Sequence, residues 1–172
     1  MTLVNFTKKH RRRNGGIRLL GLIDQREVVS ATYSELDKGF TELTLDEGAS
    51  LSKFEFLEDG AEYRETIAAK DGAPTVAHEL TFTLERMDTT AAIEAIIEAS
   101  RSGLIAVVVT INGDALLLGY SQEFGKERPL RIASAQATTG RLLSETTSET
   151  VTLRSEDVSK ARPLLDDLNN LF

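Results

Sequence analysis

A chain of 172 residues is long enough to bury a core within one domain, and because it contains no cysteine it has no disulfide framework, no thiolate metal site and no cysteine nucleophile. The composition is acidic, with a formal net charge of −7, although basic residues gather near the start. No apolar stretch is long enough for a transmembrane helix, and the start lacks the pattern of a signal peptide. We therefore expect synthesis in the cytosol and no membrane partner.

The basic residues near the start define a segment, 1–16, that we interpret as an arm. It precedes a single β-rich domain at 17–172, whose last part, 155–172, is a C-terminal tail. Without the five charges of the arm, the remainder of the chain carries −12 (−7 minus 5). Such an arm stays solvated, docks on an acidic neighbour or contacts nucleic acid. Because the remainder is acidic, a neighbouring copy of the chain is the simpler partner. The basic residues are Lys8, Lys9, Arg11, Arg12 and Arg13.

Short apolar runs after the arm predict strands. Residues 17–23 and 28–33 are two such runs, and the polar residues 24–27 between them predict a hairpin. The segment 34–50 is polar and rich in turn-forming residues, and its pattern is too weak to assign an element.

Two Asp-Gly pairs predict turns between the next strands. Asp59–Gly60 separates the apolar runs at 51–56 and 63–67, and both residue types tolerate the positive φ that tight hairpin turns require. This pair therefore predicts a second hairpin. Asp71–Gly72 predicts a further turn.

Apolar and polar residues alternate from 76 to 84, which predicts a strand with one face toward the core. His78 shares the apolar face, and we expect it to be a packed residue rather than a metal ligand or a catalytic group. The residues of this face are Val76, His78, Leu80, Phe82 and Leu84.

Helical spacing of apolar residues follows this strand. Ile93, Ile96 and Ile97 form a stripe, and Ser102–Gly103 ends the pattern. We predict one helix at about residues 89–102 that covers one end or face of a β-sandwich.

The strongest strand signal comes next. Residues 104–111 form a continuous apolar run rich in β-branched residues, which predicts a strand buried on both faces. Asn112–Gly113 then gives the strongest hairpin signal in the chain, with a return strand at 115–120.

Two further strands, at 129–133 and 150–154, flank a polar segment at 134–148, which forms an extended loop or a long exposed hairpin. Strands at short intervals with one inserted helix predict an α+β fold that is mostly β. We expect an antiparallel β-sandwich or half-open barrel with one flanking helix at about residues 89–102.

Little in the sequence indicates catalysis. Gly125–Lys126 resembles part of a phosphate-binding loop, but Tyr120 occupies the position of the first glycine and Glu127 follows the lysine, which excludes a Walker A motif. The two histidines are far apart in the sequence, and acidic pairs are more often solvated surface groups than a general acid and base. We predict no enzymatic activity, no catalytic residue, no metal site and no cofactor.

Other features favour assembly. Several predicted strands carry threonine on the face away from the core, which suits contacts between sheets of neighbouring subunits. Lysine and proline, which commonly protect the edges of sheets in monomers, are sparse near the strands. The segments 34–50 and 134–148 are long and rich in turn-forming residues without a disordered composition.

The order of elements in the second half resembles that of a known family. A helix is followed by the strand 103–109, the Asn112–Gly113 turn and the return 117–120, and later by Thr138–Gly140 and the strand 148–153. Over about residues 88–163 this order resembles the closing half of structural proteins of tailed bacteriophages, in particular tail tube proteins.

The resemblance implies a tail-tube-like β-sandwich that forms six-membered rings. In that family the inner sheets join into a continuous β-barrel lumen, and loops and arms stack ring upon ring. The chain would then be a structural subunit of the virion tail, present in the host cytoplasm during assembly. Its partners would be further copies of itself, other tail proteins and DNA, which passes without specific binding because an acidic lumen does not hold phosphates. Besides the basic arm, the interface candidates are Gly39, Phe40, Thr41, Glu42 and Leu43.

Two alternatives remain open. The first is another part of the same machinery, namely a terminator, a baseplate protein or the tube protein of an injection system. This alternative would form single rings that do not stack. The second is a small β-sandwich hydrolase or carbohydrate-binding module, which would be monomeric or dimeric and would have a concave polar pocket.

Overall fold

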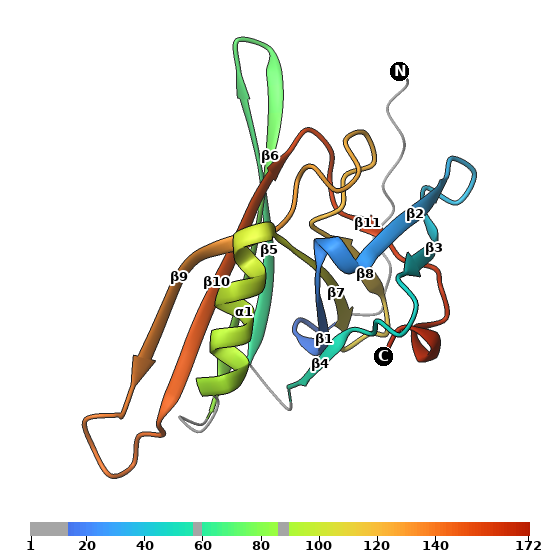
Figure 1. Cartoon of the computed structure of the whole chain (residues 1–172). Helices are drawn as coiled ribbons and strands as arrows, with labels where there is room; N and C mark the ends of the chain where they lie inside the picture. The colour runs from blue at the N-terminus through green and yellow to red at the C-terminus, as the bar shows by residue number, and fades with distance from the viewer. Residues whose placement is uncertain (1–13, 57–59, 86–89) are drawn as a thin grey trace.

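The computed structural model describes residues 14–56, 60–85 and 90–172. These residues form three antiparallel sheets, none of them closed, and one α-helix (Figure 1). The predicted class, mostly β with one flanking helix, is confirmed. None of the helices in the described ranges is long and apolar enough to cross a membrane.

Sheet A has five strands in the order β11-β8-β7-β1-β4. Its central strand, β7, pairs with β1 on one side and with β8 on the other. The strands are β1 (Ile17–Asp24), β4 (Ser52–Glu55), β7 (Leu104–Thr110), β8 (Ala115–Leu118) and β11 (Arg162–Pro163).

Sheet C has four strands in the order β5-β6-β10-β9, and sheet B is the pair β2-β3. The strands of sheet C are β5 (Ala61–Lys70), β6 (Ala73–Leu84), β9 (Arg131–Thr138) and β10 (Ser148–Asp157). Those of sheet B are β2 (Val28–Ser34) and β3 (Gly39–Leu45). The helical elements are η1 (Gln25–Glu27), α1 (Thr90–Ser102) and η2 (Leu168–Asn170).

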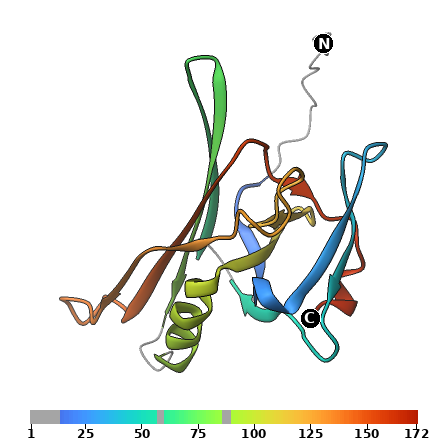
Figure 2. The ribbon, with the colours of Figure 1, turned by 45° about the horizontal axis from the view of Figure 1, so that its top comes forward.

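Sheet A lies between the other two sheets, with sheet C on one side and sheet B on the other (Figure 2). Alternate residues of β7 serve two hydrophobic cores. The even-numbered residues from 104 to 108 pack with sheet C, and the odd-numbered residues from 105 to 109 pack with sheet B. β7 is therefore buried on both faces, as its continuous apolar run predicts.

Several other sequence predictions are confirmed. In β6, residues Val76, His78, Leu80 and Phe82 are buried and Leu84 is half-buried. The turn at Asn112–Gly113 joins β7 to β8, and β9 and β10 form a long exposed hairpin. In α1, Ile93 and Ile96 are buried in the first core, whereas Ile97 is 42% exposed, so the buried stripe is narrower than predicted.

Two predicted hairpins are wrong. β1 and β2 do not pair with each other, because β1 joins β7 and β4 in sheet A and β2 joins β3 in sheet B. Between them η1 redirects the chain, with the Asp24 side chain accepting from the Arg26 backbone N–H. Likewise β4 and β5 flank the predicted Asp59–Gly60 turn but belong to different sheets. Residue 59 itself lies outside the described residues.

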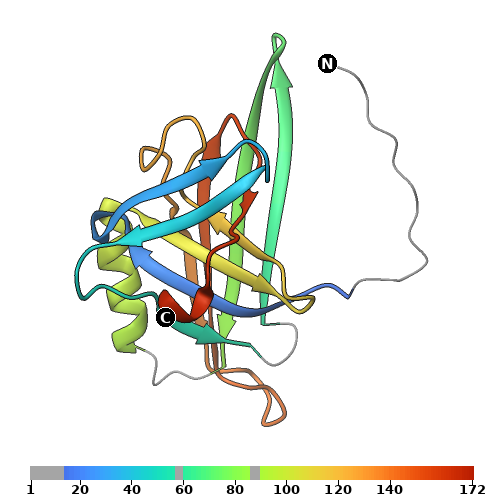
Figure 3. The same cartoon turned by 90° about the vertical axis from the view of Figure 1, so that its right-hand side faces the viewer.

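The last residues of the chain pack against their own sheet B. Leu164 and Leu171 are buried in the second core, and the Leu51 backbone N–H donates to the Leu171 carbonyl at 2.8 Å. The C-terminal residues thus lie in the same layer as β2 and β3. Figure 3 shows the molecule from the side of this layer.

Candidate assembly surface

The outer face of sheet C, which is turned away from both cores, is lined by hydroxyl groups at its centre. Thr81 and Thr83 of β6 lie opposite Thr152 and Thr150 of β10. Their Oγ1 atoms are 3.1 Å apart in the first pair and 2.9 Å apart in the second. Paired threonines of this kind stabilise neighbouring strands and make the centre of the face polar but uncharged.

Two pairs of opposite charge lie on the same face. Arg154 Nε donates to Glu79 Oε2 at 2.6 Å across β10 and β6, and Arg64 Nη2 lies 3.2 Å from Glu62 Oε1 on β5. Both of these guanidinium groups therefore have a carboxylate partner, whereas Arg131, which lies opposite Arg154 in the register of β9 and β10, donates to backbone carbonyls at the end of α1. The outer face combines hydroxyl groups with charged side chains, which distinguishes it from the two apolar inner surfaces of the fold.

Both edges of sheet C are open within the described part of the chain. β5 pairs only with β6, and β9 pairs only with β10. After Arg131, β9 contains no charged residue and no proline, and nearly all of its residues are exposed. Such an edge lacks the usual protection against pairing with another strand, so it marks a place where a further strand can add to the sheet.

The other edge borders an open groove. Where β5 begins, a groove of about 530 Å³ is lined by Gly15, Gly16, Gly60, Ala61, Glu62, Thr81 and Thr83. A side chain at Gly15 would meet no atom within 4 Å, so the groove is open there.

Two hairpins project from sheet C at opposite ends. β6 and β10 pair from Val76–Asp157 at one end to Leu84–Glu149 at the other. β5 and β6 continue beyond the first end, and the turn between β9 and β10, residues 139–147, lies beyond the second (Figure 1). A copy of the chain therefore presents a different hairpin at each end of this sheet.

The interface residues predicted from the sequence differ in their exposure, and some lie outside the described residues. Lys8, Lys9, Arg11, Arg12 and Arg13 lie outside the described residues. Gly39, Phe40 and Leu43 of β3 are buried, Phe40 and Leu43 in the second core, and Leu165 and Leu164 of the C-terminal segment lie against β3. Thr41 and Glu42 are exposed. Of the five β3 candidates, only these two present side chains to a partner.

A polar cluster fastens the loop after β10 to the inner face of sheet C. The Tyr63 hydroxyl lies 2.6 Å from Nδ1 of His78, whose Nε2 lies 3.1 Å from the Ser159 carbonyl. Burial, together with the neighbouring Glu65 carboxylate, raises the pKa of Tyr63. His78 is buried, as expected for a packed residue.

Glu65 is the charged member of this cluster. Its carboxylate accepts from the Ala161 backbone N–H at 2.9 Å and from the Tyr63 hydroxyl at 3.1 Å, and Lys160 Nζ lies 3.2 Å away. Burial favours the neutral acid, but these donors outweigh it and lower the pKa of Glu65 below its ordinary value. The carboxylate therefore stays ionised and holds residues 160–161 in place.

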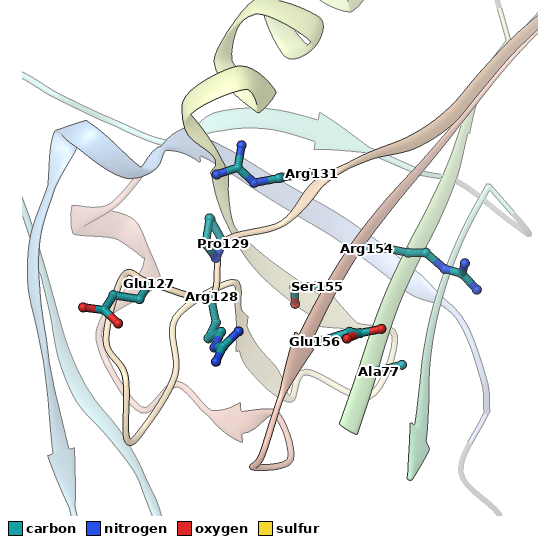
Figure 4. A pocket seen from close by; sticks show the side chains of 8 residues that line it. All are labelled: Ala77, Glu127, Arg128, Pro129, Arg131, Arg154, Ser155 and Glu156. Carbon is teal, nitrogen blue, oxygen red and sulfur yellow. The ribbon is translucent and has the colours of Figure 1, made fainter. Parts of the chain in front are cut away.

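An open pocket of about 420 Å³ lies where the loop before β9 approaches the end of β10 (Figure 4). Arg128, Arg131 and Arg154 line it, but their guanidinium groups point apart. Arg131 donates to the Arg101 carbonyl at the end of α1, Arg154 donates to Glu79, and Arg128 lies over the Phe124 ring. The three groups therefore do not converge on one anion. In the described ranges, no group of three or more acidic or histidine side chains is placed to hold a metal ion.

Comparison of the chain with protein-family models, with curated proteins and with solved structures gave no match. The functional interpretation therefore depends on the geometry of sheet C and on the sequence resemblance.

Sequence reasoning did not identify β5 and β9 as the open edges of sheet C. The run at 132–138 consists of small and polar residues with one isoleucine, so its apolar periodicity is weak. The run also lacks lysine and proline, which is unusual for an edge strand.

Proposed function

We propose that the chain is a structural subunit of a phage tail tube, which assembles into stacked rings of six copies around a lumen for DNA. The observation that carries the proposal is sheet C. It has four antiparallel strands, an inner face on the core, a polar outer face and two open edges. A sheet with these properties is suited to form one segment of a larger closed barrel.

The two edges are complementary in direction. Because each strand of sheet C is antiparallel to its neighbour, β5 and β9 run in opposite directions. When copies are related by rotation about an axis along the strands, β9 of one copy meets β5 of the next in antiparallel orientation. Repetition of this heterologous contact closes a ring in which every edge is paired.

The outer face of sheet C would line the lumen of such a ring. DNA passing through it would meet threonine hydroxyls, two arginines that have carboxylate partners, and Arg131, whose guanidinium donates to backbone carbonyls at the end of α1. Binding to phosphates strengthens with each free positive charge that is offered, so paired charges allow passage without retention. Sheets A and B would form the outer part of the wall.

Electron microscopy of the purified chain across a concentration range tests the proposal. We expect six-fold rings at moderate concentration and hollow tubes at high concentration. Single rings that never stack would instead favour a terminator. Monodisperse small particles at every concentration would contradict self-assembly as the intrinsic activity.

A pair of proline variants tests the role of the β9 edge. Adjacent residues of an antiparallel edge strand direct their N–H groups to opposite sides, so of Ala135 and Gln136 one donates toward β10 and the other toward the open edge. We expect one of the variants Ala135→Pro and Gln136→Pro to unfold at a lower temperature. The other should retain the wild-type unfolding temperature and form no rings.

Each proline variant serves as the matched control for the other. Thermal unfolding of dilute protein identifies which position faces β10, and microscopy then reports on the variant with the intact fold. Wild-type rings from that variant would show that β9 does not join neighbouring copies.

A further inference from the structure

The turn between β9 and β10 presents two leucines to solvent. Leu142 is 63% exposed and Leu143 is 109% exposed, the highest value among the large hydrophobic residues described. Neither side chain contributes to a core of the chain. An adjacent pair of fully presented leucines at the end of a projecting hairpin is a small apolar surface available to a partner.

The turn that carries these leucines is internally fixed. Glu145 Oε2 accepts from the backbone N–H groups of Arg141 and Leu142, and the Glu145 N–H donates to the Leu142 carbonyl at 3.0 Å. Gly140 adopts a φ of +73°, where a side chain would also meet Glu145. These bonds fix the conformation of the turn before any partner binds, which lowers the entropic cost of docking.

A matching apolar surface lies at the other end of the same sheet. Ile67 of β5 pairs with Val76 of β6 and therefore lies on the core side of the sheet, yet it is 57% exposed because the hairpin extends beyond the core. Ala69 and Pro74 form the next pair on this side and are also exposed. We name the surface formed by Ile67, Ala69 and Pro74 the β5–β6 patch.

We propose that Leu142 and Leu143 dock on the β5–β6 patch of a second copy of this chain, joined end to end with the first. The inference deepens the proposed function, on which it rests, by naming the contact between successive rings. The leucines and the patch lie at opposite ends of sheet C, so the leucines of one copy cannot reach the patch of the same copy. The contact therefore links copies into an open chain rather than a closed dimer. Each end carries one charge of each sign, Arg141 and Glu145 in the turn with the leucines and Lys70 and Asp71 at the tip of the other hairpin, so opposite charges can pair across the contact.

Cross-linking through introduced cysteines tests this contact directly, because the natural chain contains no cysteine. The double variant Leu143→Cys/Ile67→Cys is treated with a short bis-maleimide at a concentration at which the wild type assembles. We expect a ladder of dimers, trimers and longer chains on a denaturing gel. Each single-cysteine variant can produce dimers at most.

The matched control is Val29→Cys/Ile67→Cys, because Val29 is 52% exposed but lies on sheet B, the layer farthest from sheet C. A ladder from the Leu143 variant that is no stronger than that of the control would overturn the inference. Microscopy of the same samples separates this result from the proposed function. Rings without the ladder refute only the end-to-end contact, whereas a ladder without rings supports the contact and refutes the ring.

Discussion

The Glu65 carboxylate is held by donors from the loop after β10, and its side chain is only 15% exposed. Replacement by glutamine removes the ion pair with Lys160 while preserving the size of the side chain. We expect Glu65→Gln to lower the free energy of unfolding at pH 7 by about 1–2 kcal/mol, as for the loss of hydrogen bonds to a buried charged group. Thermal unfolding should shift by about 2–4 °C for each kcal/mol in a chain of this size.

The same substitution has a defined dependence on pH. The pKa of Glu65 is lowered in the folded chain, so its contribution to stability is fully present above the pKa of the unfolded chain and is lost as the pH falls through the folded value. The difference between wild type and Glu65→Gln should therefore shrink in acid. The control is Glu62→Gln on the same strand, whose carboxylate is 65% exposed and should contribute little at any pH. An equal effect of both variants would contradict this role for Glu65.

At the scale of elements, β7 is the strand that both cores share. Val107 is fully buried among the apolar side chains of the second core. Threonine has the same shape, so Val107→Thr introduces one hydroxyl without leaving a cavity, and we expect a loss of about 1–3 kcal/mol in denaturant unfolding. The exposed Val29 of β2 provides the control, because Val29→Thr should change stability by less than about 0.5 kcal/mol. Equal losses of stability in the Val107→Thr and Val29→Thr variants would mean that β7 is less tightly enclosed than described.

The elements themselves were largely predictable, but their partners were not. The alternation in β6, the helical stripe in α1 and the apolar run of β7 are local patterns, and each indicated the correct element. The polar residues 24–27 and the pair Asp59–Gly60 also looked like hairpin turns. Whether two consecutive strands pair depends on which distant strand offers a better match. For β1 that partner is β7, about 85 residues later in the chain, and no local signal reports it.

The candidate surface was predicted less well than the fold, for a related reason. Phe40 and Leu43 lie in a segment whose sequence pattern is too weak to assign, and they were predicted at an interface between copies. They are buried because the C-terminal residues Leu164 and Leu171 return to cover them. That contact joins segments more than 120 residues apart. The open edges of sheet C also depend on which strands pair, so they became visible only once the order of strands was known.

At the scale of the whole molecule, charge is divided between the arm and the rest of the chain. We predict that the arm pairs with acidic residues of the next ring. The triple variant Arg11→Glu, Arg12→Glu and Arg13→Glu should then prevent the growth of tubes, observed by microscopy, while rings and the unfolding temperature remain as in the wild type. The triple lysine variant at the same positions preserves the charge and should form tubes. Normal tubes from the glutamate variant would refute this role of the arm.

The number of strands in sheet C constrains how such a chain can change over time. Four antiparallel strands end in edges of opposite direction, whereas three or five would end in edges of the same direction. Copies arranged around one axis would then meet in parallel at every boundary, with a different pattern of hydrogen bonds. The gain or loss of one strand would thus alter every boundary at once, while the gain of a whole hairpin would preserve them all. Parity, more than length, is the property of this sheet that selection for a closed wall would conserve.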